Sequence, residues 1–267
     1  GKTTSLYAIV NQLNQRSRNI LTVEDPIEYY LDGIGQTQVN SKVEMTFAKG
    51  LRAILRQDPD VVMVGEIRDR ETAEIAVQAS LTGHLVLSTL HTNTAVGAIT
   101  RLRDMGVEPF LLASSLVGVI AQRLVRVLCP HCKQAAAVEG RDLLRLGYAG
   151  PPDAAVNIYQ PQGCPQCYGH GYKGRAGIFE LIPLDSAMAK LIHDGAGDMV
   201  LESHARTLAP SIQQSALDKV LAGETSLDEA LRMTLWGESV AACEYQGWRG
   251  GCGGGVPDAA GEGRGGG

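Results

Sequence analysis

The first four residues, Gly1-Lys2-Thr3-Thr4, match the end of the phosphate-binding P-loop motif, G-x-x-x-x-G-K-[ST]. In such a loop, backbone N–H groups at a helix N-terminus hold phosphate oxygens. The lysine contacts the β- and γ-phosphates of a nucleotide, and the threonine hydroxyl binds Mg²⁺. Apolar residues at helical spacing follow directly over residues 4–14. We therefore predict that Gly1, Lys2, Thr3 and Thr4 bind phosphates and that Thr3 also binds magnesium.

Three acidic residues, Glu24, Asp25 and Glu28, follow the short apolar run over residues 19–23. Three acids in a short stretch are typical of a solvated turn. At a strand end that faces a phosphate site, however, one of them can orient or deprotonate an attacking water molecule.

The fully apolar run over residues 61–64 is typical of a strand buried on both faces of a parallel sheet. It is followed by Glu66, and an acid at the carboxyl end of such a strand, beside a P-loop, is expected to bind magnesium as a Walker-B carboxylate. The run 85–89 is flanked by His84 and His91. A single histidine is more often structural, but His91 lies at the carboxyl end and is better placed for a nucleotide than His84.

Strand and helix patterns alternate through the first half of the chain and would position these residues. Apolar runs predict strands over residues 19–23, 36–40, 61–64 and 85–89, and helical spacing predicts helices over 4–14, 46–57, 70–81, 95–105 and 109–126. This alternation predicts an α/β fold with a parallel sheet. After residue 128 the pattern becomes turn-rich, and helices are again predicted over 186–222 and 227–233.

Four of the six cysteines form two C-x-x-C pairs, Cys129/Cys132 and Cys164/Cys167. Each pair can supply two thiolates to one tetrahedral metal ion, so the sequence predicts a zinc site with four sulfur ligands. Reduced free thiols or redox-active pairs are the alternative. His131 lies inside the first pair and is not expected to be a ligand. A closed four-sulfur site leaves no position for a substrate, so its predicted role is structural.

The composition excludes several classes of protein. The chain has 267 residues, 44% of them hydrophobic and 20% charged, which excludes a disordered or collagen-like chain. The net charge of −5 argues against a strongly basic nucleic-acid binder. No apolar run reaches the length of a bilayer span, and no signal peptide is visible.

These patterns divide the chain into four predicted segments. Residues 1–128 form the nucleotide-binding core, 129–182 the four-cysteine module, and 183–235 a helical C-terminal region. Residues 236–267 include the glycine-rich stretch from Gly250 onward, which has little apolar material and is predicted to be disordered or aberrant.

Several blocks together resemble the secretion ATPase superfamily, and most of all its type II secretion (GspE-like) group. The blocks are Gly1-Lys2-Thr3-Thr4, the acidic box 21–28, the Walker-B stretch 55–69, the histidine box 82–93, the four cysteines and the stretch 171–175. The resemblance covers residues 1–234. It implies a RecA-like P-loop ATPase core, followed by a zinc module and a small helical region.

The resemblance also implies an activity, cofactors and residue roles. The protein would be a cytoplasmic homo-hexamer, peripheral to the inner membrane, that hydrolyses ATP with Mg²⁺ to drive protein export through a membrane-embedded machine. Lys2 and Thr3 would contact phosphate and Mg²⁺, Glu66 would hold Mg²⁺, His91 would lie near the γ-phosphate and Glu24 would be the catalytic base. The first half of the P-loop and the family's N-terminal domains, which contact the membrane platform proteins, are expected to lie upstream of residue 1.

Other functions remain open at this point. Type IV pilus extension ATPases share most of these motifs, whereas pilus retraction ATPases usually lack the four cysteines. A catalytically inactive, zinc-stapled assembly module is a further alternative because the P-loop is truncated. A nucleic-acid translocase uses a similar core, and stimulation by DNA would favour it.

Overall fold

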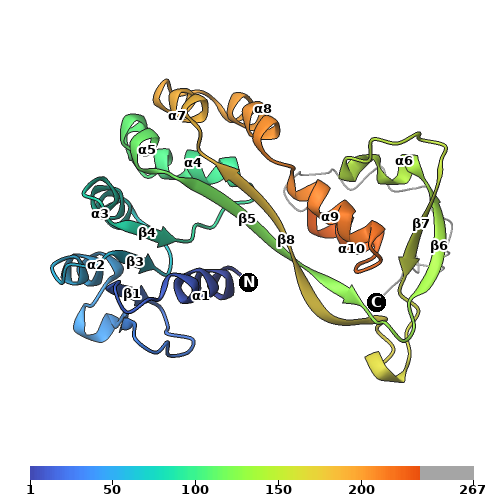
Figure 1. Cartoon of the computed structure of the whole chain (residues 1–267), viewed down its shortest axis with the longest axis horizontal. Helices are drawn as coiled ribbons and strands as arrows, with labels where there is room; N and C mark the ends of the chain where they lie inside the picture. The colour runs from blue at the N-terminus through green and yellow to red at the C-terminus, as the bar shows by residue number, and fades with distance from the viewer. Residues whose placement is uncertain (235–267) are drawn as a thin grey trace, which may run out of the picture. The chain divides into compact units, whose positions relative to one another are not determined.

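The computed structural model describes residues 1–234 (Figure 1). Its first part is a parallel sheet with the strand order β2-β1-β3-β4. The strands are β1 (Ile20–Glu24), β2 (Gly35–Gln38), β3 (Val61–Val64) and β4 (Leu85–Ser88). In the central pair, Ile20 lies opposite Val61 and Val23 opposite Val64. The predicted parallel α/β sheet is therefore confirmed.

Three helices cover the faces of this sheet: α1 (Lys2–Leu13), α2 (Phe47–Leu55) and α3 (Arg70–Leu81). On one face, Leu6 of α1 belongs to the same buried cluster as Ile20 and Met63. On the other face, Val23 and Val64 belong to a cluster that contains the buried residues of α2 and α3. Successive side chains of a strand point to opposite faces, so the fully buried side chains of β1 and β3 face both layers.

Local capping signals set where the helices on the second face begin. The Thr46 side chain accepts a hydrogen bond of 3.2 Å from the backbone N–H of Lys49 at the start of α2. Asp69 does the same for Thr72 at the start of α3, at 2.8 Å. Such caps satisfy backbone donors that have no partner within the helix. Between β2 and α2 lies the short 3-10 helix η1 (Ser41–Val43).

The structure corrects the predicted helix over residues 109–126. After α4 (Ala95–Asp104), helix α5 (Pro109–Ser115) is short, and residues 118–128 form strand β5 (Gly118–Leu128). This segment carries β-branched residues at Val119, Ile120 and Val125, which fit a pleated strand better than a helix. Its spacing predicted a helix, and pairing with a strand distant in sequence decided the outcome.

That partner is β8 (Tyr172–Pro183), which pairs antiparallel with β5 from Gly118 opposite Pro183 to Leu128 opposite Tyr172. The two strands run side by side through the middle of Figure 1. β5 belongs to the predicted core 1–128 and β8 almost entirely to the predicted module 129–182. The two predicted segments therefore share one ladder, and the division at residue 128 stays a proposal.

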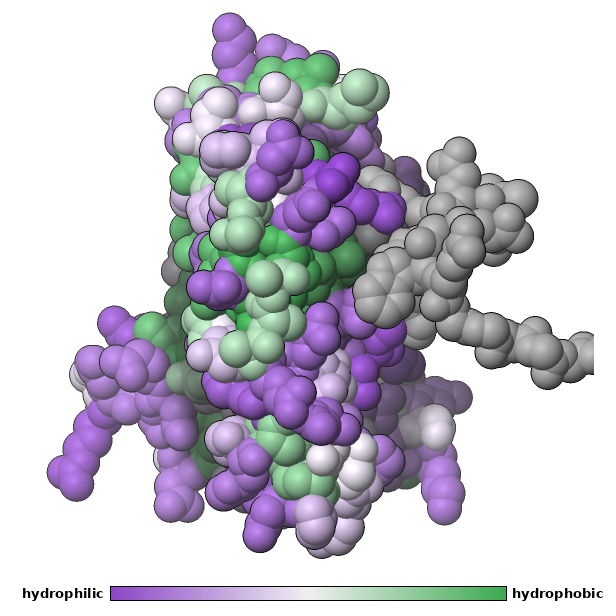
Figure 2. Space-filling view, turned by 90° about the vertical axis from the view of Figure 1, so that its right-hand side faces the viewer, coloured by the Kyte–Doolittle hydropathy of each residue, from purple (hydrophilic) through white to green (hydrophobic). Residues whose placement is uncertain are grey.

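The turn-rich stretch after Cys129 contains regular structure that the sequence did not indicate. Strands β6 (Gln134–Glu139) and β7 (Ala155–Gln160) pair antiparallel. The connection between them contains α6 (Gly140–Leu143) and the 3-10 helix η2 (Leu144–Leu146), and η3 (Pro165–Cys167) follows β7. Figure 2 faces this side of the molecule, and hydrophobic residues gather near the middle of the view with hydrophilic ones around them.

Four helices end the described part: α7 (Ser186–His193), α8 (Asp198–Leu208), α9 (Ile212–Leu221) and α10 (Leu227–Thr234). The helical prediction over 186–222 is thus correct in type, but turns interrupt it at residues 194–197 and 209–211. Ser226 caps the start of α10, since its hydroxyl accepts from the backbone N–H of Glu229 at 3.2 Å.

The predicted disordered or aberrant tail, residues 236–267, lies outside the described residues. Within the part that the structure describes, no helix combines the length and the apolar character needed to cross a membrane.

Candidate functional site

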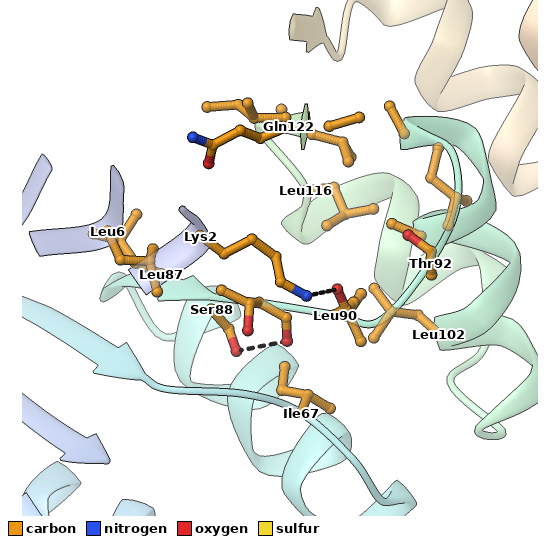
Figure 3. A pocket seen from close by; sticks show the side chains of 18 of the residues that line it. Lys2, Leu6, Ile67, Leu87, Ser88, Leu90, Thr92, Leu102, Leu116 and Gln122 are labelled. Carbon is orange, nitrogen blue, oxygen red and sulfur yellow. Dashed lines mark hydrogen bonds between the residues drawn. The ribbon is translucent and has the colours of Figure 1, made fainter. Parts of the chain in front are cut away.

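Lys2, Glu66 and His91 meet at the carboxyl ends of β3 and β4. Lys2 Nζ donates to the backbone carbonyl of Leu90 at 3.1 Å, as Figure 3 shows, and lies 3.4 Å from His91 Nδ1. The other ring nitrogen, His91 Nε2, lies 3.2 Å from Glu66 Oε2. The structure therefore brings together the predicted phosphate-binding lysine, the predicted Walker-B acid and the histidine chosen over His84.

The two strand ends are held together by backbone contacts. The Thr89 hydroxyl donates to the carbonyl of Gly65 at 2.7 Å, and the N–H of Ile67 donates to the carbonyl of Thr89 at 3.0 Å. Parallel strands deliver the residues that follow them to one edge of the sheet. This is the local reason why Glu66 and His91, 25 residues apart, become neighbours.

The carboxylate of Glu66 is held in its ionised form. Its side chain is only 12% exposed and pairs with the guanidinium of Arg68. The hydrogen bond from Arg68 lowers the pKa of Glu66 below its ordinary value, even though burial opposes ionisation. An ionised carboxylate is a suitable ligand for a hard divalent cation.

The start of α1 has backbone groups of the kind that a phosphate site uses. The helix begins at Lys2 with Gly1 as its N-cap, and no side chain caps it. Its first N–H groups therefore lack partners within the helix and are available to an anion. Thr3 is half-buried and Thr4 exposed. No hydrogen bond among the described residues joins Thr3 to Glu66, the two predicted magnesium ligands.

A cavity of about 320 Å³ lies beside Lys2 and is lined by residues of α1, β4, α4 and β5 (Figure 3). Its labelled lining includes Leu6, Ile67, Leu87 and Leu116, so the interior is largely apolar. A polyphosphate needs charged and N–H donors instead. The apolar interior of this cavity is therefore poorly suited to a polyphosphate.

Glu24, the predicted catalytic base, lies in a different environment from the Lys2 cluster. It ends β1 and is 2% exposed. Its Oε1 accepts from the Thr22 hydroxyl at 2.5 Å and from Gln36 Nε2 at 3.0 Å, while its Oε2 accepts from the Tyr7 hydroxyl. No contact among the described residues joins Glu24 to Lys2 or Glu66. Its neighbours Asp25 and Glu28 are exposed.

The sequence analysis did not identify Tyr7, Thr22 and Gln36 as partners of Glu24. One signal was available for Thr22, because residues two apart in a strand point to the same face. Tyr7 and Gln36 come from other elements, α1 and β2, and no sequence spacing indicates them.

The four predicted cysteine ligands converge on one point. Their sulfur atoms all lie within 4.8 Å of one another. Three sulfur pairs are separated by 3.9 Å (Cys129 and Cys164), 3.8 Å (Cys132 and Cys167) and 3.7 Å (Cys164 and Cys167). Regular tetrahedral coordination with zinc–sulfur bonds of about 2.3 Å places the sulfurs about 3.8 Å apart. The cluster therefore fits a zinc ion, and His131 is not part of it.

The thiols differ in how readily they ionise. Burial opposes ionisation of Cys167, but the backbone N–H groups of Cys164 and Gly171, each 3.2 Å from its sulfur, lower its pKa to about 6. Burial raises the pKa of Cys132 to about 11. A thiolate that accepts backbone N–H bonds is a ready metal ligand.

The structure combines a parallel α/β sheet, a helix that begins with a lysine, an acid after β3 and a four-thiol cluster. Together these features define a protein of the P-loop nucleotide-binding class. A model of the family "Type II/IV secretion system protein" matches residues 1–232, and the chain belongs to this family.

Curated relatives from several bacteria are similar over the same region. The chain is 64% identical over 234 residues to the "Type II secretion system protein E" of Pseudomonas aeruginosa, covering 88% of this chain and 46% of the relative. It is 63% identical over 236 residues to the "Type II secretion system ATPase E" of Vibrio cholerae, covering 88% of this chain and 46% of the relative. The chain thus spans about half the length of these relatives.

Solved structures share the fold. The pilus retraction motor PilT with bound ADP is similar with a TM-score of 0.63 and 29% sequence identity, covering 87% of this chain and 57% of that chain. The ATPase DotB of Legionella pneumophila has a TM-score of 0.62 at 23% identity, covering 87% of this chain and 56% of that chain, and supports the fold alone.

Proposed function

We propose that the chain is part of an ATP-hydrolysing motor of the type II protein secretion system. The observation that carries the proposal is the contact chain from Lys2 through His91 to Glu66, at the edge of a sheet where α/β proteins bind ligands. The similarity to relatives named as type II secretion proteins supports the choice of system.

Each residue of the cluster has a proposed role. Lys2 Nζ contacts a carbonyl and an imidazole, and no carboxylate of the described residues lies within ion-pair distance of it, so its charge is available to the β- and γ-phosphates of ATP. Gly1, Thr4 and the first N–H groups of α1 complete the phosphate cradle. Thr3 and Glu66 would hold Mg²⁺, which neutralises charge on the transferred phosphoryl group when it is bound. The contact with Glu66 orients the ring of His91, which contacts the γ-phosphate.

Glu24 is proposed as the general base that accepts a proton from the attacking water. Tyr7, Thr22 and Gln36 occupy both of its oxygens in this structure. Because Glu24 is also 2% exposed, the base role requires that water gain access to it when nucleotide binds.

The four cysteines are proposed to hold one structural zinc ion. The turn between α9 and α10 lies against this region, because Lys133 Nζ donates to the carbonyl of Gly223 at 2.8 Å and the N–H of Leu128 donates to the carbonyl of Glu224 at 2.8 Å. Zinc would thus stabilise the contact between the cysteine-bearing loops and the C-terminal helices.

The proposed partners follow the family. The motor would act as a homo-hexamer, in the cytoplasm and peripheral to the inner membrane, with platform proteins of the secretion machine as partners. No nucleic-acid partner is proposed, and the net charge of −5 agrees with this. Pilus assembly is the close alternative, and a zinc-stapled assembly module without activity is the alternative of another class, supported by the completeness of the thiol cluster.

The experiment is Mg²⁺-dependent phosphate release from ATP by the purified chain and by its Lys2→Ala variant. We expect the variant to lose turnover by about 10²-fold or more, because it loses a charge aimed at the transferred phosphoryl group. Lys42→Ala, at an exposed lysine on η1, is the matched control and should behave like the parent. Zinc binding without any nucleotide binding would favour the inactive module.

A chimera separates secretion from pilus assembly. The host bacterium lacks its own protein E and receives a chimeric gene. In the chimera, residues 1–234 replace the matching residues of protein E. Restored protein secretion supports the proposal, and restored pilus assembly without secretion favours the alternative.

A further inference from the structure

A buried polar cluster joins the helix that begins with Lys2 to the acidic segment 24–28. Tyr7 lies on α1, five residues after Lys2, and is 1% exposed. Its hydroxyl donates to Glu24 Oε2 and accepts from the backbone N–H of Glu28 at 3.2 Å. The single phenol group therefore contacts both ends of the acidic segment.

The ring of Tyr7 contacts the same stretch of chain. It packs edge-to-face against Tyr29, with the ring centroids 4.5 Å apart and the planes at 82°. Burial, followed by the bond to Glu24, raises the pKa of Tyr7 to about 12. The hydroxyl consequently stays protonated in the neutral range and acts as a donor to Glu24.

The buried carboxylate of Glu24 is stabilised by uncharged hydrogen-bond donors. It is buried, and no cation of the described residues lies within ion-pair distance of it. A buried carboxylate without a cationic partner must be stabilised by hydrogen bonds, and losing one of them leaves an unsatisfied charged oxygen. Thr22 and Gln36 both bond Oε1, so the Tyr7 hydroxyl is the donor that orients Oε2.

We propose that Tyr7 is a positioning residue for ATP hydrolysis, holding Glu24 and the backbone at Glu28 at a set position relative to the phosphate-binding end of α1. The proposal rests on the proposed function. A movement of α1 on nucleotide binding would be transmitted directly to the acidic segment through this one hydroxyl. The acids of that segment would then reach the attacking water only in a geometry that Tyr7 sets.

The test is Tyr7→Phe, which keeps the ring and removes the hydroxyl. Tyr29→Phe is the matched control, because Tyr29 belongs to the same cluster, is half exposed, and its hydroxyl makes no bond within the described residues. We expect Tyr7→Phe to lower kcat for ATP about tenfold or more, the effect of losing a hydrogen bond to a charged group. Nucleotide affinity should stay within about twofold, since Lys2 and Thr3 are untouched.

A double-mutant cycle tests whether Tyr7 acts through Glu24. In the Glu24→Gln background, Tyr7→Phe should cause little further loss of kcat, because the two residues form one unit. Equal losses in both backgrounds would overturn the proposal. So would a kcat of Tyr7→Phe equal to that of the parent, or a matching loss of affinity that indicates general damage to the fold.

Amide hydrogen exchange supplies a readout that does not depend on activity. Exchange at Glu28 and across residues 25–31 should be faster in Tyr7→Phe than in the parent and in Tyr29→Phe. If the parent neither binds nor hydrolyses ATP, the proposed function fails, and unchanged exchange in Tyr7→Phe separately overturns the holding role. If Tyr7→Phe does not fold, Thr22→Val removes another donor to Glu24 at constant shape. This variant must then lower kcat while nucleotide affinity stays nearly unchanged.

Discussion

The Lys2 cluster and the four-cysteine cluster differ in how complete each is within one chain. The cysteine sulfurs lie at distances that already suit a tetrahedral ion, and Cys129 and Cys167 are buried. By contrast, His91 is 73% exposed, Lys2 is exposed, and Thr3 and Glu24 do not contact the other members of the cluster. One chain thus places all four ligands of the thiol site in position, whereas the residues of the proposed phosphate site are exposed and only partly in contact.

This difference follows from what each site is proposed to do. A structural metal site gains stability from having every ligand in position, and its binding energy contributes to folding. A site for a nucleotide must admit and release its ligand, so its groups remain exposed until the ligand organises them. The comparison predicts that changes at the cysteines act on stability and that changes at the strand ends act on turnover.

The largest expected effect is at the cysteines. We predict one tightly bound zinc ion per chain and its loss in Cys129→Ser, since apparent binding energies of structural zinc reach roughly 10–16 kcal/mol in small zinc modules. Metal analysis and thermal melting check this. His131→Ala is the control and should keep its zinc. Less than half an equivalent of zinc in the parent, with four freely titrating thiols, would contradict the predicted zinc site.

The second largest effect is expected for Glu66→Gln, which tests the proposed phosphate site. Removing the charge should weaken Mg²⁺-dependent nucleotide binding and reduce turnover, because Glu66 is the ionised acid that contacts His91. The measurement is nucleotide affinity with and without Mg²⁺, together with steady-state hydrolysis. Glu71→Gln, at an exposed acid on α3, is the control. An unchanged Mg²⁺ dependence in Glu66→Gln would refute its metal role.

A third change separates the two acids. Glu24→Gln should leave ATP and Mg²⁺ binding nearly normal and lower turnover, since a positioned general base contributes roughly 10²–10⁴-fold. The same binding and hydrolysis assays apply. Hydrolysis at the parent rate would show that Glu24 is not the base and would shift attention to the exposed acids Asp25 and Glu28.

The smallest expected effect concerns an ion-pair network near the cysteines. Glu229 of α10 is 1% exposed and accepts from Arg126 Nη2 of β5 at 2.7 Å and from Arg232 Nη2 at 2.7 Å. Burial opposes its ionisation, but the bonds from the two arginines lower the pKa of Glu229 below its ordinary value. Glu229→Gln should therefore reduce stability by about 1–3 kcal/mol near neutral pH.

The pH dependence of this effect has a definite sign. Because the pKa of Glu229 is lower in the folded state than in the unfolded state, its contribution is present above roughly pH 4.3 and is lost as the pH falls through the folded value. Melting temperatures of the parent and Glu229→Gln should thus converge on acidification. A difference that is constant from neutral to acidic pH would contradict the assignment.

Much of the nucleotide-binding part was predictable because its signals are local. The uninterrupted apolar run of β3 indicates a strand buried on both faces, and Thr46 marks a helix start through a bond to the residue three positions on. The positions of Glu66 and His91 after parallel strands were enough to place each of them at the same edge of the sheet. The two C-x-x-C pairs likewise indicated one four-sulfur site.

Other features depended on partners distant in sequence, which no local pattern encodes. Residues 118–128 form a strand instead of a helix because β8, about fifty residues later, supplies the ladder that local spacing could not indicate. Glu24 was predicted as the catalytic base, which stays a proposal, and only the fold shows the donors from α1, β1 and β2 that surround it. The sequence by itself determined the parallel strands and indicated the candidate residues that follow them. The tertiary structure alone decided which of them remain exposed and which are buried, because burial depends on side chains that fold back from other elements.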